Sequence, residues 1–338
     1  MSDHVRSAVA SVVEGRTLSV DEARLAMGAV MDGEATPAQL AALLVALRMR
    51  GETVEELAGF ASAMRERVTP VEAPDGTIDV VGTGGDGSGT FNVSTAAALV
   101  VAAAGVPVAK HGNRAMTSRS GSADVIEALG IRMEHDAASA AADLRAFGFA
   151  FLFAPSFHPA MRHAGPTRRE IGVRTAFNLV GPLTNPAGAR RAVIGVADPV
   201  AATRIAEVAR MLGTDRTLVV HGEGIDELPL DGSGVLYDVS PKGVDRRRVV
   251  ADRLGLAAAS TGALAGGDAA QNARQIEGIF AGDRGPARDV VLLNAGAGFL
   301  AAGWAGDLGE GTAMAAKTID AGSATDLLGR LRAARSAS

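Results

Sequence analysis

A glycine-rich loop between a short apolar strand and a helix of small residues is the feature that most constrains this 338-residue chain. The pattern predicts a strand over residues 78–81 and a helix through residues 96–101, which Gly105 ends. Unpaired N–H groups at a helix N-terminus attract anions, and glycines let a ligand approach the backbone closely. The arrangement is typical of a phosphate site. Its connecting segment contains the runs Gly82-Thr83-Gly84-Gly85-Asp86 and Asn92-Val93-Ser94-Thr95.

Other kinds of glycine loop fit this segment less well. Gly82, Gly84 and Gly87 match the dinucleotide-binding pattern G-x-G-x-x-G, but that fold also needs an acidic residue about 20 positions further on. The chain has Lys110 in that region, which would suit only a 2′-phosphate. A Walker-type loop is excluded because no Gly-Lys-Ser or Gly-Lys-Thr closes the run. A plain turn without a ligand is the remaining alternative.

Composition sets the outer limits of the interpretation. With 47% apolar and 21% charged residues, the chain is typical of a soluble globular protein of one or two domains. It has no cysteine and its six histidines show no metal-ligand spacing, so we expect any metal to be bound by oxygen. The absence of long apolar stretches and of a signal peptide predicts a cytoplasmic protein without a membrane partner. The net charge of −5 argues against a nucleic-acid partner.

The first 70 residues are predicted to be helical. Capping signatures start helices at Ser19 with Glu22, at Thr36 with Gln39, and at Thr53 with Glu56. We expect most of the apolar residues on these helices to be buried, with the remainder available for a second copy of the chain. Two apolar faces stand out, one formed by Leu40, Leu43, Leu44 and Leu47 and the other by Leu57, Phe60, Ala61 and Met64.

From about residue 75, predicted strands and helices alternate, which indicates a mainly parallel sheet in an α/β fold. Ligands of such sheets bind beyond the carboxyl ends of the strands, where several loops of the chain converge. We expect exposed loops at 262–270 and 303–312, which are rich in Gly, Ala and Asp. Further strands are predicted at residues 106–109, 149–153, 192–196, 217–220 and 235–239.

Residues 110–124 combine cations, hydroxyls and glycines between a strand and a helix predicted at 125–129. Each residue by itself fits a solvated basic turn, but the density of donors favours an anion site. Lys110 can neutralise phosphate, and Thr117, Ser118, Ser120 and Ser122 can donate hydrogen bonds. Asp124 is predicted to be a helix-start charge.

Asp226 and Glu227 are adjacent carboxylates just after the strand predicted at 217–220. Such a pair is usually solvated, but beside a phosphate loop it indicates magnesium, which prefers carboxylates together with water and substrate phosphate. Neighbouring side chains of an extended segment point in opposite directions, so each carboxylate can address a different ion.

A Pro- and Gly-rich segment follows at residues 153–186. Arg168 in this segment suits a bidentate grip on a carboxylate, although a structural ion pair with Glu170 or near Asp143 is an alternative. His158 is either a packed histidine or a ligand contact. Pro166, Gly181 and Pro182 are better explained as rigid crossings between two parts of the fold.

Taken together, these motifs resemble the anthranilate phosphoribosyltransferase family over nearly the whole chain. The resemblance implies a small helical domain (1–71 plus about 167–187) hinged to a large α/β domain (72–166 and 188–338) with a mainly parallel central sheet. It also implies a homodimer, and it leaves association with an anthranilate synthase component open. The motifs that carry it are Gly-Thr-Gly-Gly-Asp, Asn-Val-Ser-Thr, Lys-His-Gly-Asn-Arg, Ser-Gly-Ser-Ala-Asp, Phe-Asn-Leu-Val-Gly-Pro-Leu-Thr-Asn-Pro and Asp-Glu.

The same resemblance assigns residues to substrates. It implies magnesium ligands at Ser94, Asp226 and Glu227, with two Mg²⁺ ions per monomer. It implies anthranilate contacts at Gly82, Asn113 and Arg168. Phosphoribosyl pyrophosphate is expected at Gly82, Gly85, Asp86, Thr90, Asn92, Val93, Ser94, Thr95, Lys110, His111, Gly112, Asn113, Arg114, Ala115, Met116, Thr117, Ser118 and Ser122.

Two positions depart from what the resemblance leads us to expect. Ala115 lacks a hydroxyl that some members of the family carry, so only its backbone can contribute. The run 294–299 is richer in glycine than the expected alanine-rich helix, which calls the local helix packing into question.

The implied reaction is attack of the neutral anthranilate amine on C1 of the ribose as magnesium pyrophosphate leaves, and it needs no general base. The alternatives are a pyrimidine nucleoside phosphorylase and a non-catalytic nucleic-acid-binding relative on the same scaffold. A phosphorylase would leave Asp226 and Glu227 without a role, and a nucleic-acid binder would need a basic surface.

Overall fold

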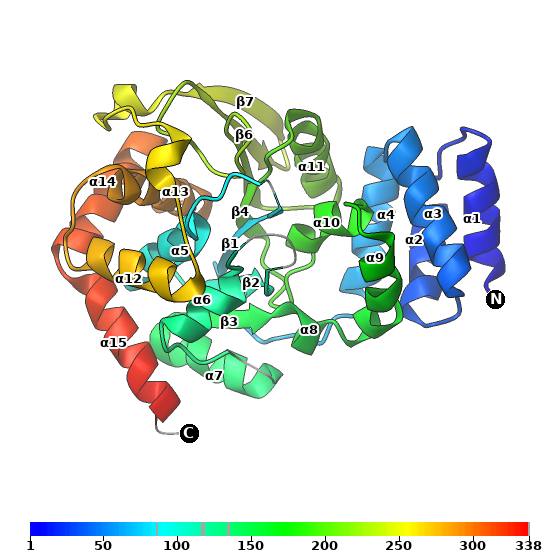
Figure 1. Ribbon diagram of the computed structural model, residues 1–338, viewed down its shortest axis with the longest axis horizontal. Helices are drawn as coiled ribbons and strands as arrows, with labels where there is room; N and C mark the ends of the chain where they lie inside the picture. Colours follow the sequence, from blue (N-terminus) through cyan, green and yellow to red (C-terminus); the bar gives the residue numbers. More distant parts are fainter. Residues whose placement is uncertain (86, 116–118, 134–135, 337–338) are drawn as a thin grey trace.

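A computed structural model describes residues 1–85, 87–115, 119–133 and 136–336 of the chain. Its first part is a bundle of helices, on the right in Figure 1, in which α2 packs closely against α4 and α1 packs against α3. The predicted starts of the second to fourth helices are confirmed, because Ser19, Thr36 and Thr53 each form a complete capping box. The helices are α1 (Asp3–Val13), α2 (Val20–Met31), α3 (Pro37–Arg50) and α4 (Val54–Arg65).

Both predicted apolar faces of the bundle are buried. Leu43, Leu44 and Leu47 have no exposed surface, and Leu40 has 2%. Burying a leucine side chain contributes about 1.5–3 kcal/mol, so this face alone is a substantial part of the stability of the bundle. The second face is buried as well, at Leu57, Phe60, Ala61 and Met64.

The centre of the molecule is a seven-stranded sheet in the order β3-β2-β1-β4-β5-β6-β7. Strands β1 to β5 are parallel, and β6 and β7 join the edge as an antiparallel hairpin. This confirms the predicted mainly parallel sheet. The strands are β1 (Ile78–Gly82), β2 (Val108–Gly112), β3 (Phe149–Phe153), β4 (Arg191–Gly195), β5 (Arg216–His221), β6 (Gly234–Ser240) and β7 (Gly243–Val249).

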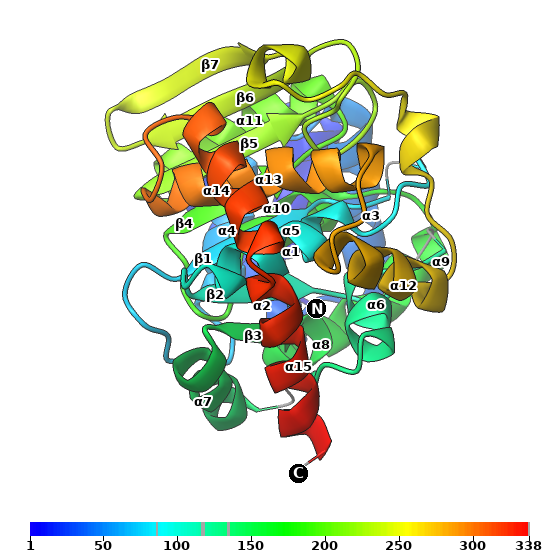
Figure 2. The same cartoon turned by 90° about the vertical axis from the view of Figure 1, so that its left-hand side faces the viewer.

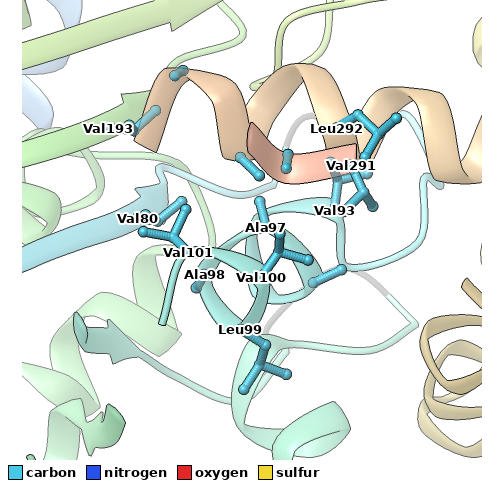
Figure 3. Packing of buried hydrophobic residues seen from close by; sticks show 14 of the residues in the cluster. Val80, Val93, Ala97, Ala98, Leu99, Val100, Val101, Val193, Val291 and Leu292 are labelled. Atoms are coloured by element: carbon cyan, nitrogen blue, oxygen red, sulfur yellow. The ribbon is translucent and has the colours of Figure 1, made fainter. Parts of the chain in front are cut away.

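Alternate residues of the strands face two different helical layers. Val80 and Val193 belong to the core with α5 (Val93–Ala103) and α13 (Pro286–Ala302), part of which Figure 3 shows. Val81 and Ile194 belong to the core that contains α11 (Pro199–Met211) and the N-terminal bundle. Figure 2 shows the outer helices of the first layer, namely α12 (Ala269–Phe280), α14 (Leu308–Asp320) and α15 (Ser323–Ser336).

The segment between β3 and β4 returns from the sheet to the bundle. Within it, α9 packs against α3, and α10 packs against α4. Residues 66–77 and 181–190 are thus two of the three chain crossings between the bundle and the sheet, and the return from β3 to α9 is the third. The remaining elements are α6 (Ser122–Ala128), α7 (Ala137–Phe147), α8 (Ala154–Phe157), η1 (Pro159–His163), α9 (Gly165–Ile171), α10 (Ala176–Val180), η2 (Gly181–Leu183), η3 (Ala251–Leu254) and η4 (Thr261–Leu264).

Three local predictions need correction. The expected loop at 262–270 contains η4 and the start of α12, and most of the expected loop at 303–312 after residue 307 belongs to α14. Strand β7 was not predicted, because three consecutive arginines (residues 246–248) hide its alternation; at a sheet edge, such charges discourage pairing with another chain. The glycines of α13 do not loosen its packing, since Gly296 lies against Gly311 and Thr312 of α14 where any Cβ would clash.

None of the helices in the described part of the chain is both long enough and apolar enough to cross a membrane.

Candidate active site

Three neighbouring strands, β1, β2 and β4, end in glycine at the same edge of the sheet. A Cβ on Gly82 would lie 2.3 Å from Oδ2 of Asp226, and one on Gly195 would lie 1.7 Å from the backbone oxygen of Asp226. The N–H of Gly84 donates to Asp226 Oδ2 at 2.8 Å. The loop after β5 can therefore rest on the ends of β1 and β4 only because those positions lack side chains, and this fixes the Asp226 carboxylate beside the glycine loop.

Lys110 lies beneath this edge, with 1% of its surface exposed. Its ammonium donates to the backbone oxygen of Val80 and to Ser94 Oγ, the latter at 3.3 Å. Burial lowers the pKa of Lys110 to about 8, while Asp79, Asp226 and Glu227 oppose that shift. The Lys110 ammonium is therefore not exposed in the cleft. It lies behind Ser94 and the two carboxylates, and its positive charge acts on the cleft from there.

Helix α5 begins at the site with Ser94 in its first turn. Asn92 precedes the helix, but within the described residues its side chain does not cap it, and the first turn carries no acidic residue. The Asn92 amide instead donates to Ser120 O at 3.3 Å, and its oxygen accepts from Asn272 at 2.9 Å. The positive end of the α5 dipole is left without a carboxylate from its own first turn, as an anion site requires.

Ion pairs and hydrogen bonds tie the residues directly after β2 to helix α6. Arg114 contacts both Asp124 and Glu127 at 2.9 Å. Asp124 accepts from the N–H groups of Gly121 at 2.9 Å and Ala115 at 3.0 Å, which confirms it as a helix-start charge for α6. The guanidinium of Arg114 is therefore already neutralised on the side of α6. Ser122 donates to the backbone oxygen of Asn113 at 3.3 Å, which ties the two predicted contacts together.

A buried polar cluster that the sequence did not predict supports the site from below. Asp79 accepts from Asn185 Nδ2 at 2.7 Å and from the N–H of His111 at 3.2 Å. Burial raises the pKa of Asp79 to about 6, and nearby Lys110 opposes that shift. The signal available in the sequence was Asp79 itself, a charged residue at the second position of the otherwise apolar strand β1.

The two histidines near the site are buried and uncharged at neutral pH. The rings of His111 and His158 lie 5.0 Å apart. Burial lowers the pKa of His111 to about 3 and that of His158 to about 4. Each ring has an Nε2 atom with no hydrogen-bond partner among the described residues. His158 is thus a packed histidine, as the first alternative from the sequence has it, and its ring lies against that of His111.

Arg168 lies on α9 with its guanidinium over the Phe177 ring, 4.7 Å from the ring centre. Burial lowers its pKa, and among the described residues neither Glu170 nor Asp143 forms an ion pair with it. Asp143 pairs with Arg132 instead. Arg174, to which no role was assigned from the sequence, donates to the backbone oxygen of Gly85 at 2.9 Å. This contact joins the α9–α10 turn to the glycine loop.

Four further residues that were predicted to contact the substrate lie before or in α5 and at the end of β2. Val93 and Thr95 are buried in the wall of α5, and Thr90 forms a bridge with Ala265. Gly112 lies so close to Ser122 that a Cβ would be 2.2 Å from the hydroxyl. Predicted contacts that lie outside the described residues are Asp86, Met116, Thr117 and Ser118.

Comparison with known proteins defines the class of protein to which this chain belongs. Residues 75–325 match the glycosyl transferase family a/b domain, and residues 6–68 match the helical bundle domain of that family. The chain belongs to this glycosyl transferase family.

Individual relatives narrow the class. The chain is 51% identical over 334 residues to the anthranilate phosphoribosyltransferase of Thermomicrobium roseum, covering 97% of this chain and 96% of that protein. The crystal structure of the Thermus thermophilus enzyme superposes with a TM-score of 0.91 at 48% identity, covering 96% of this chain and 98% of that one. The Saccharomyces cerevisiae enzyme in complex with PRPP (phosphoribosyl pyrophosphate) and Mg has a TM-score of 0.91 at 26% identity, with coverage of 100% and 99%. Within its family, the chain thus falls among the anthranilate phosphoribosyltransferases, as its motifs predicted.

Proposed function

We propose that the cleft at the glycine ends of β1, β2 and β4 is where this chain transfers the phosphoribosyl group of phosphoribosyl pyrophosphate to the amine of anthranilate. The products are N-(5-phosphoribosyl)anthranilate and pyrophosphate, and the chain is a pentosyltransferase (EC 2.4.2.18) of tryptophan biosynthesis. The relatives support this function over a phosphorylase or a nucleic-acid binder. The observation that carries the proposal is the convergence of Ser94, Lys110 and Asp226 at the N-terminus of α5.

The phosphate groups fit the glycine loop and the start of α5. Backbone N–H groups are the natural partners of phosphate oxygens, and at this helix no carboxylate of its own first turn competes for them. Lys110 adds a positive charge from behind Ser94, where low exposure strengthens its field. These groups would stabilise the negative charge that develops on the departing pyrophosphate.

The reaction uses Mg²⁺, which is present with PRPP in the yeast relative's structure. The described residues contain no cluster of three or more His, Cys, Asp or Glu able to form a closed metal cage. The donors at the cleft fit magnesium nonetheless, because this ion takes one or two carboxylates and completes its shell with water and substrate phosphate. Ser94, Asp226 and Glu227 are the proposed ligands, with one ion for each carboxylate. Bound there, Mg²⁺ would neutralise pyrophosphate charge.

Arg168 is the proposed partner of the anthranilate carboxylate. Its guanidinium is partly buried against Phe177 and pairs with no carboxylate among the residues described. A ligand carboxylate would supply that ion pair. Gly82 and Asn113 are proposed as further contacts. His111 and His158 add neutral aromatic surface, because burial keeps both rings uncharged at pH 7.

No side chain is assigned as a general base. The amine of anthranilate is nucleophilic when neutral, so alignment of the reactants and stabilisation of the leaving group supply most of the acceleration. Water competes for the same ribose carbon. We propose that the bundle with residues 167–187 forms one domain that closes on the α/β domain and excludes it, and the contact of Arg174 with Gly85 supports this role.

We also propose that the chain is a homodimer through its N-terminal helices. Large apolar side chains remain exposed on α1 to α3, including Val13 at 70% and Met49 at 83%, together with Leu25 and Val45. Such residues are the usual material of a self-complementary interface. A cytoplasmic location belongs to the same proposal, because a polyanionic substrate does not cross a lipid bilayer unaided.

The test of this function is the fluorescence of anthranilate mixed with the protein, phosphoribosyl pyrophosphate and Mg²⁺. We expect a decay that requires all three components and becomes at least about 100-fold less efficient in Arg168→Ala, because a charged bidentate contact is lost. Arg169→Ala is the matched control, an exposed arginine of the same helix that should keep full activity. A flat trace from folded protein would overturn the proposal.

The metal ligands need a separate experiment. Mg²⁺ titration calorimetry with the substrate present should show that Asp226→Asn and Glu227→Gln each lose a different ion. Equal loss of both ions in either variant would contradict the assignment of one ion to each carboxylate.

A further inference from the structure

A second cavity, of about 300 Å³, lies at the opposite end of the sheet from the cleft. Asp79, Ala192, Ile194 and Thr217, from the strands β1, β4 and β5, form its floor. The crossings at residues 66–77 and 181–190 form most of its walls, and the ends of α4 and α11 close it. A cavity of this size is at the lower limit of small-molecule sites, which span about 300–1,000 Å³.

Arg65, the last residue of α4, brings a positive charge to this cavity. Its Nε donates to the backbone oxygen of Leu183 at 2.7 Å, and among the described residues no carboxylate forms an ion pair with it. Arg65 as a whole is exposed to solvent, but the surrounding protein and, to a lesser extent, the nearby guanidinium of Arg190 lower its pKa. Arg190 itself is paired with Asp215 at 2.7 Å, so its charge is already balanced. Arg65 has no such acidic partner among the described residues.

The other walls are mostly apolar. They are formed by aliphatic and proline side chains of the crossings and of the end of α11, namely Val68, Pro70, Val71, Pro182, Pro186 and Leu212. Asp79, the only acidic residue in the lining within the described part of the chain, has its two carboxylate oxygens engaged by Asn185 and the N–H of His111. An occupant must therefore be small, largely apolar, and able to accept hydrogen bonds from a guanidinium.

We propose that this cavity is a binding site, separate from the catalytic cleft, for a small apolar carboxylate whose charged end pairs with Arg65. The carboxylate would displace water from Arg65 and give it the counterion that it lacks among the described residues, and its hydrocarbon part would fill the space between the crossings. The ligand would contact α4 of the bundle and β4 of the sheet at once, so its occupancy would join the two parts of the molecule at their connection.

Methyl NMR of the full-length protein tests the proposal. The probe is cyclohexanecarboxylate, with cyclohexanecarboxamide as its uncharged counterpart. The Ile194 methyl reports on the cavity, and the Ile225 methyl, adjacent to Asp226, reports on the cleft. We expect a saturable shift of Ile194 with the carboxylate, binding at least about tenfold tighter than the amide, because charged hydrogen bonds contribute more than neutral ones.

Arg65→Gln should weaken the carboxylate at least about tenfold and leave the weak binding of the amide unchanged. Arg48→Gln, which removes an exposed arginine of α3, is the control for the change in net charge. Equal affinity for acid and amide, no saturable shift at Ile194, or a shift confined to Ile225 would each overturn the proposal. The comparison of acid with amide needs no variant, so it decides the matter even if Arg65→Gln does not fold. Catalytic activity does not enter this test, so its failure would leave the proposed reaction untouched.

Discussion

Three helices of the N-terminal bundle and the helix at the cleft begin in opposite ways. Helices α2, α3 and α4 each start with a complete capping box, so side chains of the helix itself satisfy their first N–H groups. Helix α5 starts after Asn92 with no capping side chain among the described residues, and its first turn is uncharged. Helices α2 to α4 are thus capped by their own side chains, whereas the N-terminus of α5 at the cleft is left open to an external anion.

The same contrast holds for glycine. In the bundle, Gly59 lies where a Cβ would meet the backbone of α2, so it allows two helices to pack. At the cleft, Gly82 and Gly195 instead make room for Asp226, a charged loop residue. One region uses small residues for its own stability, and the other uses them to hold a charge at a surface that a ligand must reach.

Gly195→Ala should give the largest loss of activity among the variants that test this contrast. The added Cβ would lie 1.7 Å from the Asp226 backbone oxygen, where ordinary contacts begin at 3.4 Å, so the loop must move. Since a displacement of about 1 Å can cost about 100-fold in rate, we expect kcat/KM to fall by more than about 100-fold. Steady-state kinetics would measure it. Gly329→Ala in α15, where nothing lies within 4 Å of a Cβ, is the control and should retain activity.

Asn92→Asp tests whether the N-terminus of α5 is kept free for an anion. Aspartate is a good N-terminal residue for a helix but loses the amide donor to Ser120 O, so the free energy of unfolding should fall by no more than about 1–2 kcal/mol. Its charge would repel substrate phosphate, and at about 5 Å this costs about 3 kcal/mol for an effective dielectric constant of 20. We therefore expect kcat/KM for phosphoribosyl pyrophosphate to fall about 100-fold. Unchanged kinetics would remove the distinction between α5 and the bundle helices.

The buried histidines predict a pH dependence that the bundle does not share. Burial lowers the pKa of His158 from 6.5 to about 4, so the unfolded chain binds a proton between these values that the folded chain does not. The contribution of His158 to stability should therefore fall as pH decreases from 6.5 to 4, by about 2 kcal/mol between pH 7 and pH 5. Urea unfolding at both pH values would measure it. His158→Asn should lose this part of the dependence, and an identical pH profile would contradict the prediction.

Thr36→Ala should give the smallest effect. It removes the capping hydroxyl that accepts from the N–H of Gln39 at 3.2 Å, at a cost of about 1 kcal/mol in the free energy of unfolding. Activity at 25 °C should be unchanged, because α3 lies outside the cleft. Thermal unfolding and the fluorescence assay together would check this, and a large loss of activity without loss of stability would be inconsistent with a purely structural role.

Much of the fold was predictable because its signals are local. The caps of the bundle, the glycine loop and the carboxylate pair each lie within a few consecutive residues. The two helix starts that were mistaken for loops follow the same rule: Asp268 and Asp307 accept from the N–H groups of Gln271 and Glu310. Reading them as capping residues, as was done for Ser19, would have placed α12 and α14.

The rest depends on contacts between distant parts of the chain. Asn185 reaches Asp79 across 106 residues, and Arg174 reaches Gly85 across 89, so no window of sequence contains either pair. The cavity at Arg65 has the same origin, because its walls come from the crossings at residues 66–77 and 181–190. The individual motifs of the candidate site were thus visible in the sequence, but the polar cluster beneath them was not.

The return of the chain to the bundle has a consequence for synthesis on the ribosome. Helix α4 ends at Arg65 and α9 begins at Gly165, so the bundle helices emerge 100 residues before the segment that packs on α3 and α4. At about 5–20 residues per second, this leaves an interval of about 5–20 s. During that interval, the apolar surface that α9 and α10 later cover is exposed, and it can be sheltered only by a chaperone or by another nascent chain.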